Sequence, residues 1–261
     1  MFKYLLFSIS ILAGVNVTAQ DIPGQKGMIT DRPDQTESST LISKGFLQVE
    51  TGVFYESYEE TEIETKIIGY NTSLFRYGFL QNLELRLGFD VQKNKTEYIG
   101  EGIGGQKTGL SPLLLGAKIG IAEENNILPE IAFLGHLYLP FMASDSYKPE
   151  TTGVDFRFAF SHTLSERSGL AYNFGAQWGD DNPEAIYILT LSYAFEVTGN
   201  FGIFAEYFTD FPEDGSSVHS FDGGITYSLK PNIQLDAYAG RGITDNSYFL
   251  IGAGISFRIP K

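Results

Sequence analysis

The feature that most constrains this chain is a strict two-residue alternation of apolar and polar side chains. Between Leu83 and Val91 every odd position is large and apolar, and every even position is charged or glycine. A β-strand points successive side chains to opposite faces, so this pattern predicts a strand with one apolar and one polar face. We expect twelve such strands, with cores at residues 47–55, 68–76, 83–91, 113–121, 131–139, 154–160, 170–178, 187–197, 201–207, 221–229, 233–239 and 249–259.

The charged residues of these segments sort by face. We assigned the apolar face of each segment from its apolar residues. In every segment except the second, all charged residues then lie on the opposite face. These residues are Glu50, Glu84, Arg86, Asp90, Lys118, Asp155, Arg157, Glu196, Glu206, Asp222, Asp236 and Arg258. In the second segment Ile68, Tyr70, Thr72 and Leu74 share a face that ends in Arg76. This pattern would place Arg76 on the apolar face, at a membrane boundary where a charge costs little.

Long connections alternate with short ones such as 198–200 and 230–232, and the longest spans 92–112. Outer-membrane barrels show this alternation and an even strand number. We therefore predict an all-β protein, with a transmembrane antiparallel up-and-down β-barrel of about twelve strands over residues 45–261 and both termini in the periplasm. A soluble β-sandwich also alternates and stays open as the alternative. Strand lengths near those of tilted membrane strands, and aromatic residues at the strand ends, favour the barrel.

The first residues predict export. Lys3 precedes an apolar run from Leu5 to Val15, and Val17-Thr18-Ala19 resembles a cleavage site. We interpret residues 1–19 as a signal peptide, with a short N-terminal anchor as the alternative. Together with the barrel, this predicts the outer membrane of a Gram-negative bacterium, with outer-membrane lipid and the barrel-assembly machinery as partners.

Several classes of function are disfavoured. The formal net charge of -14 argues against nucleic-acid binding, and the absence of cysteine excludes thiolate chemistry. Gly100 to Gly105 matches a dinucleotide-binding pattern but lies in the longest connection, so we expect a flexible outer loop. The three histidines lack metal-ligand spacing, and we expect Ser217, His219 and Ser220 to be loop residues. We predict no metal, no cofactor and no enzyme, with a lipid-modifying enzyme as the least favoured alternative.

One motif before the first strand is distinctive. It reads Thr-Asp-Arg-Pro-Asp-Gln-Thr-Glu-Ser over residues 30–38, and Gly-Phe-Leu-Gln-Val-Glu-Thr-Gly follows over 45–52. Together with the last strand, which contains Gly252 to Arg258, this resembles the family called putative MetA-pathway of phenol degradation. The resemblance implies an exported β-barrel of the transporter kind and suggests uptake of aromatic compounds.

The polar faces should line a narrow lumen. Besides the charged residues above, His136 and Glu130 have lumen parity, and acids outnumber bases, which favours cations or neutral solutes. Alternatively, these charges pair and brace the wall. We predict a channel or transporter for small molecules, including aromatic or hydrophobic ones; the alternative is a structural barrel of the envelope.

Residues 20–44 are polar, and we expect them to enter the lumen as a plug. Asp31, Arg32 and Asp34 are the candidates for holding it. We expect Arg32 to bind Glu50 or Glu84, and Asp31 or Asp34 to bind Arg86 or Arg157. A disordered periplasmic tether stays open as the alternative.

Overall fold

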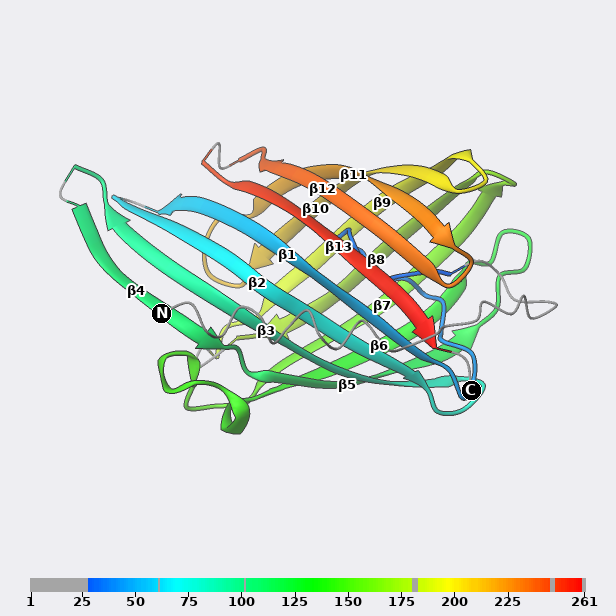
Figure 1. The fold of residues 1–261 in the computed structure, drawn as a ribbon, viewed down its shortest axis with the longest axis horizontal. Coiled ribbons are helices and arrows are strands. Elements are labelled where there is room, and N and C mark those ends of the chain that lie inside the picture. The colour runs from blue at the N-terminus through cyan, green and yellow to red at the C-terminus, as the bar shows by residue number, and fades with distance from the viewer. Residues whose placement is uncertain (1–27, 61, 101, 180–182, 245–246, 260–261) are drawn as a thin grey trace.

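A computed structural model describes residues 28–259, apart from 61, 101, 180–182 and 245–246. The segment interpreted as a signal peptide and its cleavage site lie outside these residues. The described chain is almost entirely β-structure (Figure 1). Its strands are β1 Leu47–Glu60, β2 Ile63–Gly78, β3 Leu83–Tyr98, β4 Gly102–Leu110, β5 Leu113–Ala122, β6 Glu130–Leu139, β7 Gly153–Ser165, β8 Ser168–Trp178, β9 Ile186–Thr198, β10 Phe201–Pro212, β11 Val218–Lys230, β12 Ile233–Gly242 and β13 Phe249–Ile259.

The strands close into a single antiparallel barrel. β1 pairs with β13, β2 pairs with both β1 and β3, β5 pairs with β3 and β6, and the strands from β6 to β13 pair with their neighbours in sequence. Among the described strands β4 pairs with β3 alone, and the other twelve close the ring, which is the arrangement that membrane-spanning sheets require. The prediction of a twelve-stranded up-and-down barrel is therefore confirmed, with one additional strand.

The additional strand, β4, is one half of a barrel strand that is interrupted at Pro112. β3 pairs with β5 along Leu83–Gly88 and with β4 along Val91–Tyr98, so β4 and β5 follow each other along one edge of β3. Pro112 has no backbone N–H to continue the ladder at the junction. The expectation of a flexible outer loop at Gly100–Gly105 is wrong, because β4 begins at Gly102 and only the tight turn before it is irregular. Positive φ angles at Gly100 and Gly102 suit that turn.

The two ends of the barrel differ in their connections. At one end the strands are joined by 79–82, 123–129, 166–167, 199–200 and 231–232; at the other lie 140–152, 179–185 and 213–217. The segment 140–152 contains two short 3-10 helices, η1 Pro140–Met142 and η2 Asp145–Tyr147. We call these the turn end and the loop end. Strands β1 to β3 extend well beyond their predicted cores toward the loop end, so β1 ends at Glu60 and β2 begins at Ile63.

The outside of the barrel is apolar and its inside is polar. Leu115, Leu191 and Ile225 are among many large apolar side chains exposed on the outer face. The buried set, in contrast, is dominated by polar and charged side chains from alternate strand positions. This is the reverse of a soluble sandwich, in which apolar side chains fill the core. No helix in the described ranges is long and apolar enough to cross a membrane.

Candidate functional site

Residues 28–44 run through the inside of the barrel. The backbone N–H groups of Asp31 and Arg32 each donate to Glu50 Oε2 of β1 at 3.0 Å. On the far wall, the Glu37 N–H donates to Asn173 Oδ1 of β8 at 2.7 Å. The segment thus bonds to strands on both sides of the lumen. We call residues 28–44 the inner segment.

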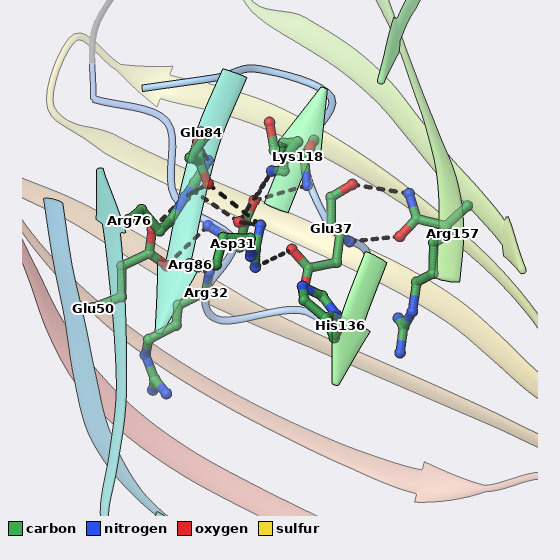
Figure 2. Close-up of polar contacts among 12 residues, drawn as sticks. Asp31, Arg32, Glu37, Glu50, Arg76, Glu84, Arg86, Lys118, His136 and Arg157 are labelled. Carbon is green, nitrogen blue, oxygen red and sulfur yellow. Dashed lines mark hydrogen bonds and ion pairs between the residues drawn. The ribbon is translucent and has the colours of Figure 1, made fainter. Parts of the chain in front are cut away.

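Asp31 is the centre of an ionic network (Figure 2). Its carboxylate lies 2.8 Å from Arg86 Nη1 of β3, 3.0 Å from Arg76 Nη1 of β2 and 3.1 Å from Lys118 Nζ of β5. Burial by itself raises the pKa of Asp31, but the three cations outweigh burial and hold that pKa well below its usual range. One carboxylate of the inner segment therefore binds three adjacent strands in its ionised form.

Arg76 is part of this network and not of the outer surface, so the placement predicted for it is wrong. Its side chain is fully buried, with Nε 2.8 Å from Glu84 Oε1 and Nη1 2.9 Å from Glu50 Oε1. The cause is a β-bulge at Tyr70, where the ladders to β1 and β3 both shift by one residue. A bulge adds one residue to a strand and reverses the parity beyond it. Thr72, Leu74 and Arg76 consequently face the lumen, whereas Ile68 and Tyr70 face outward.

Arg32 uses a different acid from those expected. Its Nη2 lies 3.0 Å from Asp236 Oδ1 of β12, and Glu50 receives only the backbone N–H. The guanidinium passes over two glycines of the wall: a Cβ on Gly52 or Gly254 would lie 2.5 Å from it. Only glycine permits this approach, so the small residues of β1 and β13 define the position of Arg32.

Asp34 lies in an acidic environment instead of beside Arg86 or Arg157. Burial, followed by the nearby charge of Glu206, raises the pKa of Asp34 well above its usual range. Glu206 accepts hydrogen bonds from the Gln35 N–H and the Thr36 hydroxyl. Asp222 is also buried, and its carboxylate has no hydrogen-bond partner among the residues that the structure describes. This side of the inner segment therefore combines three acids.

The inner segment also has contacts that the sequence analysis did not single out. Glu37 lies 2.8 Å from Arg86 Nη2, and the Ile42 N–H donates to Glu84 Oε2 at 2.9 Å. Ser39 and Thr40 donate to Glu130 Oε2 at 3.1 and 2.9 Å. The polar composition of residues 30–40 was the available signal for these contacts, but it did not identify the partner of each side chain.

The remaining predicted lumen residues differ in burial and in partners. His136 and Asp155 are buried, with Nδ1 3.2 Å from Oδ1, and Arg157 lies 3.1 Å from the same carboxylate. Asp90 and Arg258 are partly exposed, and Arg258 Nε donates to Gln48 Oε1 at 2.9 Å. Glu196 is exposed at the turn end, close to the connection 199–200. The inner segment thus contacts only part of the predicted set directly.

Ser217, His219 and Ser220 lie apart from the ionic network. His219 and Ser220 belong to β11 and are not loop residues as expected, because the β10–β11 pairing extends to Val218. Ser217 Oγ lies 2.9 Å from His219 Nε2, and the Tyr207 hydroxyl lies 2.7 Å from Nδ1. Within the described ranges, no carboxylate hydrogen-bonds to this ring and no three acidic or histidine side chains form a metal-binding group.

Two cavities flank the inner segment. One, of about 290 Å³, lies toward the loop end and is lined by Gln35 together with Glu56, Asp210 and Tyr248 of the wall. The other, of about 350 Å³, lies toward the turn end and is lined by Thr30, Ser38 and Glu130, among others. The inner segment contributes residues to both cavities and lies between them.

Solved structures with this fold include outer-membrane proteins. An outer-membrane channel from Pseudomonas putida F1 aligns with a TM-score of 0.66 at 14% identity, over 87% of this chain and 100% of its own. The NanC porin aligns with a TM-score of 0.51 at 10% identity, over 80% and 98% of the two chains. At these identities the likeness shows the fold.

No curated protein sequence matches the chain. A family model does match, over residues 30–259, and so includes both the Asp31–Ser38 motif and the last strand. This match confirms the predicted resemblance. The protein belongs to the family described as putative MetA-pathway of phenol degradation.

Proposed function

We propose that this protein is a channel for small molecules in the outer membrane of a Gram-negative bacterium, and that the inner segment closes its lumen. The observation that carries the proposal is the binding of Asp31 to Arg76, Arg86 and Lys118 inside the barrel. A barrel that only braced the envelope would need no chain threaded through its polar interior. Cleavage after residue 19, periplasmic termini and insertion by the barrel-assembly machinery belong to the same proposal.

The size of the barrel supports a narrow passage. Eight-stranded barrels fill their interior with side chains, and barrels of sixteen strands leave an open aqueous channel. Twelve strands enclose an intermediate lumen that one extended chain can occupy. The cavities of about 290 and 350 Å³ on either side of the inner segment are the vestibules of this passage.

The family description supports an aromatic solute. It refers to phenol degradation, and a small aromatic compound is of a size that these vestibules accommodate. The polar lining favours a solute that carries polar groups of its own, because buried carboxylates in the wall need hydrogen-bond or ionic partners. The protein acts by passage of a solute. In the part of the chain that the structure describes, the ring of His219 contacts hydroxyl groups and no carboxylate.

The test is single-channel conductance in planar bilayers. Deletion of residues 21–40 should raise the conductance, because it removes the inner segment from the lumen. Different migration of boiled and unboiled samples in SDS gels serves as the control for an assembled barrel. If the assembled deletion variant conducts no better than the full mature chain, the inner segment does not close the lumen. If neither protein conducts, the barrel is a structural component of the envelope.

A further inference from the structure

The cavity at the loop end has an unusual charge composition. Its wall includes the carboxylates of Glu56 from β1 and Asp210 from β10. Neither carboxylate has a hydrogen bond or an ion pair with any other residue that the structure describes, although both are partly shielded from solvent. In contrast, Glu50, Glu84 and Asp236 deeper in the lumen are all paired with arginine.

The cation in this cavity is already engaged. Arg157 donates to Asp155 Oδ2 from both Nε, at 3.2 Å, and Nη2, at 3.1 Å, and its Nη1 donates to the Gln35 carbonyl at 3.2 Å. Asp155 is therefore the carboxylate that is ion-paired with Arg157, although the charge of Arg157 also acts on Asp210. The cavity keeps an excess of negative charge from Glu56 and Asp210, and a ligand that enters meets it.

The wall beside these acids is aromatic and aliphatic, since Leu250 pairs with Glu56 and Ile188 pairs with Asp210 in the ladder. The rings of Phe208 and Tyr248 meet edge to face with centroids 6.3 Å apart, and Leu250 and Ile188 are buried beside them. Aromatic faces attract cations as well as apolar groups, because the ring carries negative charge on its face. Carboxylates and aromatic rings thus favour the same kind of ligand.

We propose that this cavity binds a small organic cation with an apolar or aromatic body, such as a protonated primary amine, as it passes through the channel. The inference rests on the proposed channel function and specifies its solute class. The volume of about 290 Å³ is close to the lower end of ligand pockets, roughly 300–1,000 Å³. The ammonium group would give Glu56 or Asp210 the partner that it lacks, and the body would pack on Phe208 and Tyr248.

The alternative ligand classes fit less well. An anion would meet two carboxylates, whose like charges repel it. A neutral aromatic molecule would displace water from Glu56 and Asp210 without pairing them, which costs free energy. A positive charge on the ligand is therefore what distinguishes this proposal from the passage of an aromatic solute in general.

The experiment compares three ligands of similar size by isothermal titration calorimetry on the full mature chain in detergent. Benzylammonium chloride should bind more tightly than benzyl alcohol and sodium benzoate. The double variant Glu56→Gln/Asp210→Asn should weaken benzylammonium binding about tenfold, the ratio expected for the loss of one hydrogen bond to a charged group. The single variants, each nearly isosteric, provide the same test if the double variant does not assemble.

Asp214→Asn is the matched control, because Asp214 is exposed beyond β10 and does not line the cavity. It removes the same charge and should leave benzylammonium binding unchanged. The proposal is overturned if benzylammonium binds no tighter than benzyl alcohol, or if the cavity variants bind it as the unaltered protein does. Conductance without selective binding would overturn this site and leave the channel; binding without conductance would do the opposite.

Discussion

The carboxylate of Asp31 and the guanidinium of Arg86 meet inside the barrel, with Oδ2 and Nη1 2.8 Å apart. The two residues belong to different parts of the chain, since Asp31 precedes the barrel and Arg86 is in its third strand. Arg76 and Lys118 reach the same carboxylate, so one acidic side chain of the inner segment joins three strands. This convergence makes the proposed closure of the lumen accessible to a single substitution.

Asp31→Asn should release the inner segment. Removing one partner of a buried ion pair costs about 3–5 kcal/mol, because the remaining charges stay desolvated without compensation. We expect a higher conductance and a lower temperature for the gel-mobility change. Asp214→Asn, which removes an exposed charge, should alter neither. An Asp31→Asn protein with unchanged conductance would contradict the role assigned to the network.

The β-bulge at Tyr70 should account for the parity of β2. Deleting Tyr70 removes the extra residue, so Ile68 would still face outward, Arg76 would still face the lumen, and the barrel should assemble. Inserting one alanine after Leu74 adds a residue to a regular part of the strand, turns Arg76 toward lipid and should block assembly. The measurement is the fraction of heat-modifiable protein in the outer-membrane fraction. Equal fractions for the deletion and the insertion would show that the bulge does not define the parity.

A charged side chain on the outer face should destabilise the barrel more strongly the closer it lies to the middle of the membrane. Leu191 is exposed at the middle of β9, and Arg at this position should cost about 2–4 kcal/mol. Leu229 is exposed beside the connection 231–232, and Leu229→Arg should cost only about 0–1 kcal/mol, because the side chain reaches the interface. The free energy of unfolding in urea, measured for the protein inserted in lipid vesicles, gives the cost of each substitution. Equal costs at the two positions would contradict the membrane orientation.

Closure of the lumen should weaken as pH rises. The pKa of Asp34 is raised in the folded protein by burial and by Glu206, so the docked inner segment favours the protonated form. The stabilisation is complete below the ordinary aspartate pKa of about 3.9 and is lost as pH rises through the raised value. Conductance should therefore increase with pH across this window.

Asp34→Asn keeps this side chain neutral and should flatten the increase. The matched variant Asp214→Asn removes an exposed acid beyond β10 and should leave the pH dependence in place. A full pH response in Asp34→Asn would assign the titration to other groups of the lumen.

The alternation of side chains determined the class of fold without any tertiary information. Its period of two is a local property of strands, and the sorting of residues such as Glu84 and Leu85 to opposite faces follows from local geometry alone. For this reason twelve strands could be predicted close to their observed positions. The alternation also placed acids and bases in the lumen, although it identified none of their partners.

Only the tertiary structure decided where the side chains of a strand switch faces and which charged side chains form ion pairs. The bulge at Tyr70 depends on how β2 pairs with β1 and β3, and no local pattern announces it, so Arg76 was assigned to the wrong face. The side chain of Arg32 binds Asp236 and not Glu50, because β1 pairs with β13 so that Gly52 and Gly254 leave room for the guanidinium. Ion pairs across a barrel depend on the register of strands distant in sequence, and that register exists only once the barrel has closed.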